Sequence, residues 1–231
     1  MSSEKWKGFK SMPNNTNPTA GGFPSWLQQI RESLIKEDGA VVNCGECTAC
    51  CTSSYLIHIR PEETLAIKHI NKKLLFPAPG LLKGHLLLGY FESGHCPMFK
   101  ANKCSIYKFR PVTCRNYDCR IFTAAVIDPG GDDKVLITQR SRHWEFSYPT
   151  QKDRDEYSAV KAAATFTQGH ACCFPGGKVP NDPSQLAILA IKVYTVFLNN
   201  NAEPGRTEGA NSDIKVARAI VEANELFEAN R

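Results

Sequence analysis

Long apolar segments are missing from the sequence, and their absence bears on where the protein works. Residues 1–7 contain no apolar core, so they do not resemble a signal peptide. The longest apolar run, residues 186–198, is interrupted by Lys192 and is too short to span a bilayer. We therefore expect a cytoplasmic protein that does not associate with a membrane, in a compartment where thiols stay reduced.

Motifs of common enzyme classes are also missing. The sequence contains no G-x-S-x-G nucleophile elbow, no H-E-x-x-H zinc motif and no Rossmann glycine fingerprint. Residues 176–178 lack the earlier glycine of a P-loop, which argues against nucleotide binding of that kind. The six histidines are scattered, and only His95 and His170 lie near cysteines. We assign no catalytic residue, so any enzymatic chemistry must come from a bound metal.

Cysteine, in contrast, is abundant and unevenly placed. Eight of the ten cysteines lie between residues 44 and 119. They form two groups: Cys44, Cys47, Cys50 and Cys51, and then Cys96, Cys104, Cys114 and Cys119. Thiolate sulfur is the donor that zinc and iron–sulfur clusters select, whereas disulfides are rare in a reducing compartment. The grouping predicts that all eight cysteines are metal ligands.

The spacing of the first group suits more than one metal. Cys44, Cys47 and Cys50 form the C-x₂-C-x₂-C run of a bacterial [4Fe–4S] site, which takes a further ligand from elsewhere in the chain. Pairs of cysteines would also satisfy a zinc site. Adjacent Cys50 and Cys51 rarely bind one ion together without strain, so one can ligate while the other packs or serves a second centre. Either a helix or a knuckle turn around Gly45 could present these thiols.

The cysteine pattern resembles a known family, the YkgJ-like cysteine-cluster proteins with their CxxCxxCC zinc- or iron-chelating domain. The matching residues are Cys44, Cys47, Cys50, Cys51, Cys96, Cys104, Tyr107, Arg110, Pro111, Cys114, Arg115 and Cys119. This resemblance covers about one third of the chain and implies chelation of zinc or iron. From the C-x₂-C-x₂-C spacing we favour a [4Fe–4S] cluster over Zn²⁺ as the cofactor. Some relatives are Fe–S oxidoreductases, but that activity does not transfer automatically. Cys172 and Cys173 lie outside the pattern, and we expect them to be dispensable.

The net charge of +5 arises from one stretch, residues 100–120. Its basic residues are Lys100, Lys103, Lys108, Arg110, Arg115 and Arg120, against the single acid Asp118. A nucleic-acid surface is one interpretation, because basic and aromatic side chains alternate here. Charge compensation is the other, because four thiolates around Zn²⁺ or a [4Fe–4S]²⁺ core leave a net charge of about −2. We favour compensation and predict that nucleic acid is not a partner.

The rest of the sequence predicts an α+β fold, a mostly helical small domain with short strands, organised around a cysteine-bound metal site. Helices are expected at residues 25–35, 61–70, 153–166, 183–198 and from residue 212. Short strands are expected at residues 55–59 and 86–91, and an antiparallel pair at 135–138 and 144–148. We divide the chain into a flexible leader (1–24), a cysteine-cluster metal-binding domain (25–180) and a C-terminal helical extension packed on the same domain (181–231).

These features predict a metal-binding cysteine-cluster protein, with iron or an iron–sulfur cluster favoured and zinc possible. Its role would be in redox chemistry, electron transfer or metal handling, with an unidentified redox or protein partner. If it is an enzyme, the activity would be of the Fe–S-dependent oxidoreductase type. The alternative is a structural zinc domain that acts as a protein-interaction module without catalysis.

Overall fold

The computed structural model describes residues 19–42, 44–198 and 210–230. Its α-helices are α1 (Phe23–Lys36), α2 (Thr64–His69), α3 (Val112–Arg115), α4 (Arg120–Ala125), α5 (Val135–Arg142), α6 (Gln151–Gly169), α7 (Pro183–Val193), α8 (Thr195–Leu198) and α9 (Ala210–Ala229). Among these described residues, no helix is both long and apolar enough to cross a membrane.

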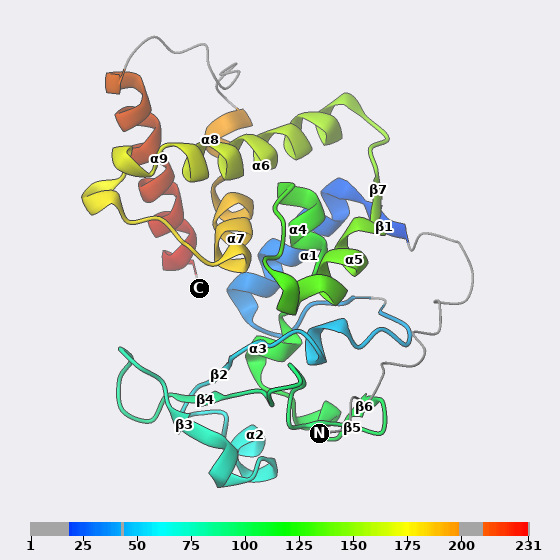
Figure 1. The fold of residues 1–231 in the computed structure, drawn as a ribbon. Helices are drawn as coiled ribbons and strands as arrows, with labels where there is room; N and C mark the ends of the chain where they lie inside the picture. Colours follow the sequence, from blue (N-terminus) through cyan, green and yellow to red (C-terminus); the bar gives the residue numbers. More distant parts are fainter. Residues whose placement is uncertain (1–18, 43, 199–209, 231) are drawn as a thin grey trace, which may run out of the picture.

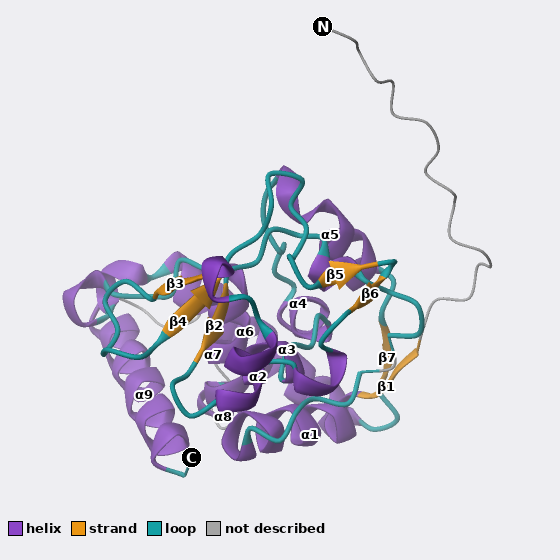
Figure 2. Cartoon of the chain, turned by 90° about the horizontal axis from the view of Figure 1, so that it is seen from below, coloured by secondary structure: helices purple, strands orange, loops and turns teal. Residues whose placement is uncertain are grey.

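The strands are short and form three separate small sheets (Figure 2). They are β1 (Thr19–Gly22), β2 (Ile57–Ile59), β3 (Leu75–Pro77), β4 (Leu86–Leu88), β5 (Phe99–Lys100), β6 (Lys103–Cys104) and β7 (Glu145–Ser147). Strand β1 pairs in parallel with β7, β4 lies antiparallel between β2 and β3, and β5 and β6 form an antiparallel hairpin. The fold is therefore of the mixed α+β type, as predicted.

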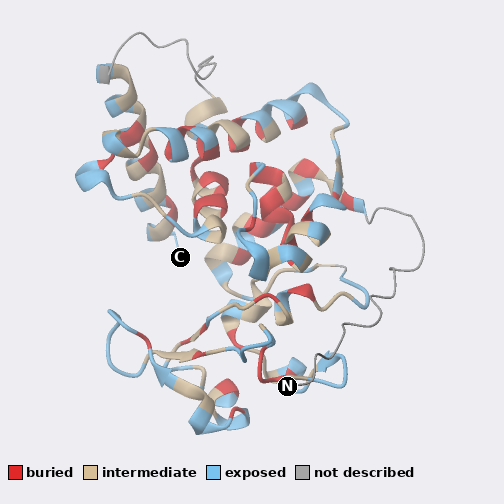
Figure 3. Ribbon diagram, in the orientation of Figure 1, coloured by how far each residue is buried: buried red, intermediate tan, exposed pale blue. Residues whose placement is uncertain are grey.

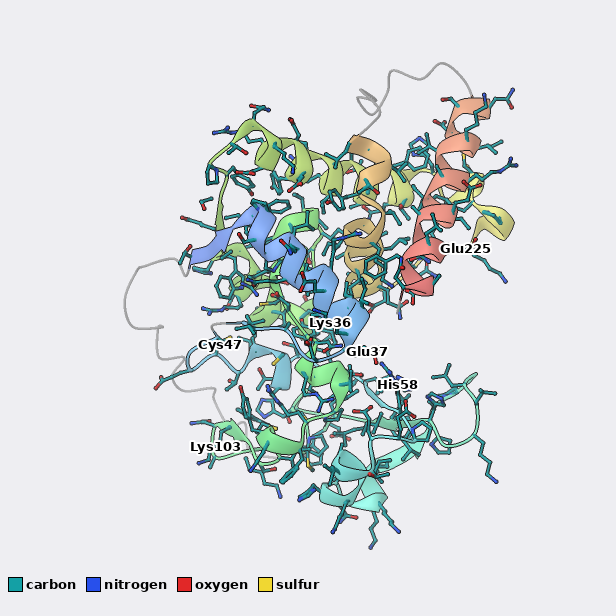
Figure 4. All side chains as sticks on the ribbon, turned by 180° about the vertical axis from the view of Figure 1, so that it is seen from behind. Lys36, Glu37, Cys47, His58, Lys103 and Glu225 are labelled. Atoms are coloured by element: carbon teal, nitrogen blue, oxygen red, sulfur yellow. The ribbon has the colours of Figure 1, made fainter. Side chains whose placement is uncertain are left out.

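The elements divide into two parts (Figure 1). We call the first the helical body: α1, α4–α9 and the β1–β7 pair. We call the second the strand lobe: residues 55–109, with β2–β6 and α2. Helix α3 lies between them, and Arg60, just after β2, pairs with Glu37 at the end of α1. Figure 4 shows Glu37 and His58 of β2 near this junction.

The main hydrophobic core lies in the helical body, where buried residues gather on the facing sides of α1, α4, α6 and α7 (Figure 3). Phe23, Trp26, Leu27 and Ile30 follow helical spacing along one face of α1 and are all buried. Helix α7 packs against α4, α6 and α9. The body thus has a continuous apolar interior.

The strand lobe has a second, smaller core. It contains Ile57, Ile59, Leu88, Met98 and Ile106, each buried, with Cys96 among them. Alternate residues of β2 point inward, as a strand with one buried face requires. The chain therefore has two separate apolar cores, and cysteines pack in both of them.

Several expected elements are present with shifted ends. The first predicted helix is α1, but Gly22 rather than Ser25 is its N-cap, with Pro24 in its first turn. The helix expected at 153–166 is α6, which begins earlier because Thr150 and Asp153 form a capping box. The helix expected at 183–198 is interrupted at Tyr194 and forms α7 and α8.

Two predictions were wrong. Residues 135–138 were expected to pair with 144–148, but they begin α5, and β7 pairs with β1 instead. A short apolar run does not distinguish strand from helix by itself, and here the buried residues Ile137 and Ser141 are one helical turn apart. The flexible leader predicted at residues 1–24 is too long. Residues 19–24 form β1 and the start of α1, while residues 1–18 lie outside the described residues.

A buried ion pair ties four segments of the helical body together. Asp118 and Arg120 contact each other at 2.7 Å and are only 2% and 8% exposed. Asp118 also accepts a hydrogen bond from Trp26 Nε1 of α1 at 2.9 Å. Arg120 donates to the carbonyls of Val41 (2.8 Å) and Ala20 (3.4 Å). The pair therefore fixes the start of α4 against α1, β1 and the segment before Cys44.

Replacing Arg120 by leucine should lower the free energy of unfolding by about 3–5 kcal/mol, because it leaves the Asp118 carboxylate buried without a counter-charge. Urea unfolding measures this loss. The matched control is Arg142→Leu, which breaks an exposed ion pair with Asp128 and should cost at most about 1 kcal/mol. Equal losses in the two variants would show that the buried pair has no special role.

Candidate metal centre

Cys44 and Cys47 lie on a tight turn that follows α1. The Cys47 N–H donates to the Cys44 carbonyl at 3.0 Å, and Gly45 within the turn has φ +56°. A left-handed conformation suits glycine at this position because it carries no Cβ. The structure thus selects the knuckle turn over the helix, the two alternatives that the spacing left open. Figure 4 labels Cys47 in this segment.

Cys50 and Cys51 follow on a one-turn 3₁₀ helix, Ala49–Cys51. Ala49 is buried in the core of the body, and the Ser53 hydroxyl donates to its carbonyl at 2.7 Å. Lys134 holds the chain just beyond, donating to the Ser53 carbonyl at 2.6 Å. The two cysteines are therefore anchored on both sides.

Cys96 is brought to Cys51 by backbone hydrogen bonds. The Cys96 N–H donates to the Cys51 carbonyl at 2.8 Å, and the Ser54 N–H donates to the Gly94 carbonyl at 2.9 Å. Gly94 has φ +79°, and a Cβ on it would lie 2.8 Å from the Ser54 hydroxyl. This close approach of two segments requires glycine.

Cys104 is the last residue of the β5–β6 hairpin and lies opposite Phe99. The two connecting residues, Ala101 and Asn102, have φ +47° and +59°, which is the pattern of a type I′ turn. The Phe99 N–H donates to the Cys96 carbonyl at 2.9 Å. The hairpin thus folds Cys104 back toward Cys96.

Cys114 lies on α3, the short helix between the two parts. Pro111 is its N-cap, and the Cys114 N–H donates to the Pro111 carbonyl at 3.0 Å. The Thr113 hydroxyl donates to the carbonyl of His58 at 2.7 Å, and the Val112 N–H donates to the Glu63 carboxylate at 2.6 Å. Both contacts fasten α3, and with it Cys114, to the strand lobe.

Cys119 precedes α4, between the two members of the buried ion pair. It is 6% exposed and accepts a hydrogen bond from Trp144 Nε1 at 3.2 Å. Hydrogen bonds to sulfur are among the contacts that tune metal–thiolate centres. Sequence analysis missed Trp144 because the indole lies 25 residues from Cys119 along the chain.

The thiols that pack in the core of the strand lobe, Cys51 and Cys114 from outside the lobe included, act on one another. Burial raises the pKa of Cys114, and the neighbouring Cys96, Cys51 and Cys104 raise it further. Burial raises the pKa of Cys96 to about 11. The hydrogen bond with Cys50, together with the Arg110 guanidinium, lowers the pKa of Cys51 to about 7. These effects place Cys51, Cys96, Cys104 and Cys114 in one neighbourhood.

The thiols beside the core of the helical body act on one another in the same way. Burial raises the pKa of Cys119 to about 12, with further contributions from Asp118, Cys44 and Cys47. Desolvation raises the pKa of Cys44, and the Cys47 thiol raises it further. Cys44, Cys47 and Cys119 are therefore a second neighbourhood.

Three arginines have a buried Nε atom without a hydrogen-bond acceptor within the part of the chain that the structure describes: Arg110, Arg115 and Arg140. Arg110 and Arg140 also lower the pKa of nearby thiols. Arg110 stacks on Tyr107, with Cζ 3.6 Å from the ring centroid, and Arg140 stacks on Trp144 at 4.6 Å. A buried N–H without an acceptor is costly, and a thiolate would satisfy it. Arg140 lies on α5, and the sequence assigned it no role.

The basic residues of the stretch 100–120 differ in the contacts that they make. Arg110 lowers the pKa of three thiols: Cys51, Cys104 and Cys114. Arg120, expected to compensate thiolate charge, instead pairs chiefly with Asp118. The lysines of the stretch, Lys100, Lys103 and Lys108, are all exposed, and Figure 4 shows Lys103 near the edge of the molecule. Of these residues, the structure supports compensation most directly for Arg110.

The last two cysteines lie elsewhere. Cys172 and Cys173 are on a 3₁₀ helix packed against α9, with their Sγ atoms 3.9 Å apart. His170 stacks on Phe166 at 4.4 Å between ring centroids, and the exposed His95 packs edge-on against Phe99. Neither histidine is therefore placed as a ligand by these contacts.

In the residues described, no three His, Cys, Asp or Glu side chains are arranged so as to hold a metal ion as they stand. The chemistry of the neighbourhoods nonetheless fits a metal. Their donors are all sulfur, which suits Zn²⁺ or an iron–sulfur cluster, and Arg110 and Arg140 offer N–H groups to thiolates.

Comparison with known families agrees with this chemistry. Residues 43–152 match the family model described as "CxxCxxCC: Putative zinc- or iron-chelating domain". This region of the chain is therefore similar to that domain, and we refer to residues 43–152 as the CxxCxxCC domain because of this similarity. No curated protein and no solved structure matches the chain. All eight cysteines of the two groups fall inside the CxxCxxCC domain, whereas Cys172 and Cys173 fall outside it.

Replacing Gly94 by alanine should destabilise the CxxCxxCC domain by about 1 kcal/mol more than replacing Gly80, as measured by urea unfolding. Both glycines have positive φ (+79° and +75°), so the conformational cost is matched. Only at Gly94 does the new Cβ meet an atom, the Ser54 hydroxyl. Adding Ser54→Gly should remove the difference. If Gly80→Ala costs as much, the close approach is not what positions Cys96.

Zinc affinity should rise at least about tenfold between pH 6.5 and 7.5, because thiols with pKa values of about 11 and 12, Cys96 and Cys119, must lose protons on binding. Competition with a chelator of known pH dependence measures the affinity. Binding through carboxylates, already ionised in this range, would leave the affinity nearly constant. A flat profile would therefore contradict thiolate ligation.

Proposed function

We propose that the CxxCxxCC domain holds iron, as an iron–sulfur cluster, on its cysteine thiolates, and that the protein works in redox chemistry, electron transfer or metal handling. The ligands are Cys44, Cys47, Cys50, Cys51, Cys96, Cys104, Cys114 and Cys119. The metal-binding domain would span residues 25–180, with the chain from residue 181 packed on it. A cytoplasmic location and an unidentified redox or protein partner belong to the same proposal.

One observation carries the proposal: buried or half-buried thiols from distant segments of the chain lie in the same neighbourhood, and we assign no oxygen or nitrogen ligand to it. Cys51, Cys96, Cys104 and Cys114 all pack in the same apolar core of the strand lobe. An all-sulfur donor set in apolar surroundings selects soft metals over Mg²⁺ or Ca²⁺. The C-x₂-C-x₂-C run of Cys44, Cys47 and Cys50 supports a [4Fe–4S] cluster over zinc.

The chain's own residues would stabilise and tune such a centre. A bound iron–sulfur cluster would supply one-electron transfer. Trp144 donates a hydrogen bond to the Cys119 sulfur, and Arg110 and Arg140 lower the cost of burying negative thiolates. Any catalysis would be of the Fe–S-dependent oxidoreductase type, and we assign no catalytic role to a side chain.

A second candidate function is a structural zinc domain that docks a protein partner, and one observation favours it. Large apolar side chains are exposed on the strand lobe: Leu56, Leu65, Phe76, Leu81, Leu82, Tyr90, Phe91 and Tyr107. Exposed apolar residues gathered on one region are a feature of interaction surfaces. A zinc ion on the lobe cysteines would then cross-link the loops that carry this surface.

Purification without oxygen separates the two candidates. The iron proposal expects brown protein with iron and acid-labile sulfide in equal amounts, whereas colourless protein with zinc supports the structural domain. The variants Cys51→Ser and Cys114→Ser should each lose metal, and chelation should unfold the strand lobe, as followed by circular dichroism and protease resistance.

The matched control is the Cys172→Ser/Cys173→Ser double variant, which changes cysteines outside the matched residues 43–152 and should not affect the metal content. A loss of metal in this control as large as in Cys51→Ser would show that the site extends to α9. Protein that holds neither iron nor zinc after purification without oxygen would refute both candidates.

A further inference from the structure

We propose that the eight cysteines form two separate four-thiolate metal centres, and that the adjacent residues Cys50 and Cys51 belong to different ones. The lobe centre would be Cys51, Cys96, Cys104 and Cys114. The body centre would be Cys44, Cys47, Cys50 and Cys119. This inference rests on the proposed function, and it adds the number of centres and the ligands of each.

The lobe centre is defined by packing and by backbone contacts. Its four cysteines all belong to the apolar core of the strand lobe. The Cys96 N–H donates to the Cys51 carbonyl, and the hairpin that ends at Cys104 is joined to Cys96 through Phe99. Helix α3 carries Cys114 and is fastened to the carbonyl of His58 in β2. Four segments thus present one thiol each to one apolar core.

The body centre is defined by contacts with the core of the helical body. Cys119 is buried in the core of the helical body, and Cys47 packs against the same core. The turn at Gly45 holds Cys44 next to Cys47. The Asp118–Arg120 pair binds the Val41 carbonyl and so brings the segment before Cys44 to Cys119. None of these contacts involves the core of the strand lobe.

The 3₁₀ helix Ala49–Cys51 is the point where the two centres separate. Successive side chains on a 3₁₀ helix are turned by about 120°, because it has three residues per turn. Ala49 is buried in the core of the body, whereas Cys51 packs in the core of the strand lobe. Cys50 is exposed, outside both cores. It hydrogen-bonds to Cys51 and lies within the electrostatic reach of both Cys114 and Cys44, so these contacts place it between the two centres. We assign it to the body centre because it completes the C-x₂-C-x₂-C run with Cys44 and Cys47.

Each centre also has its own arginine. Arg110, stacked on Tyr107, acts on the thiols of the lobe centre, and Arg140, stacked on Trp144, acts on Cys44 of the body centre. In the described residues both guanidinium groups keep a buried Nε without an acceptor. Two thiolate centres, each with a net charge of about −2, would each need a nearby cation.

The first test counts zinc in the wild-type chain, because thiolate sites for iron–sulfur clusters also bind zinc. Metal-free protein is titrated with Zn²⁺ without oxygen, and the bound metal is measured after gel filtration. We expect two equivalents per chain, and the Cys172→Ser/Cys173→Ser variant should also bind two. Saturation at one equivalent would overturn the inference and leave the proposed function standing. No binding would refute the proposed function as well.

The second test assigns the ligands by alkylation of the zinc-loaded protein and mass spectrometry, with fragmentation between residues 50 and 51. In Cys114→Ser, one equivalent should bind and protect Cys50 while leaving Cys51 reactive. In Cys119→Ser, one equivalent should protect Cys51 while leaving Cys50 reactive. Equal protection of Cys50 and Cys51 in both variants would overturn the division.

The arginines give variants that keep every ligand. Arg110→Gln should weaken zinc binding roughly 10- to 100-fold at the lobe centre alone, which is the effect of losing one charged hydrogen bond. Arg140→Gln should weaken the body centre alone by a similar factor. Alkylation of Cys96 reports the first centre and alkylation of Cys47 the second. If either variant weakens both centres equally, the thiols form one site.

Discussion

The buried pair of Asp118 and Arg120 is the interaction on which the arrangement of the cysteines depends. Cys119 lies between these two residues, so its position follows from their contacts. Through Trp26, Ala20 and Val41 the pair joins α1, β1 and the segment that leads to Cys44. A charge pair this deep is stable only if each polar atom is satisfied. Its many hydrogen bonds therefore fix the geometry around Cys119 as a unit.

The chain has two apolar cores. The helical body buries its apolar residues among α1, α4, α6 and α7, and the short strands pack around a second, smaller core. The strand lobe has strands of only two or three residues, and sheets this small are marginal in water. Thiolate–metal bonds across Cys51, Cys96, Cys104 and Cys114 would supply the missing cohesion, since metal-binding energy is folding energy in such domains.

Thiolates gathered around a metal would concentrate negative charge, and side chains that also pack would lower its cost. Within the described residues, Arg110 and Arg140 each lie over an aromatic ring, which holds the guanidinium in place without an acidic partner. An acidic partner would cancel the charge that thiolates would need, as Asp118 does for Arg120. Stacked arginines and an acid-paired arginine thus perform different tasks, although they lie close in the sequence.

The sequence by itself determined which motif and which helices could be recognised. The number and spacing of the cysteines match the family model described as a zinc- or iron-chelating domain, and the helix propensity of residues 153–166 predicts the helix α6. Tertiary structure alone decided which thiols are neighbours, because Cys51 and Cys96 are joined by backbone hydrogen bonds between distant segments. It also decided that Arg140 and Trp144 flank the site. Local pattern records periodicity and turn chemistry, whereas contacts such as that of Trp144 with Cys119 arise only when separate elements pack together.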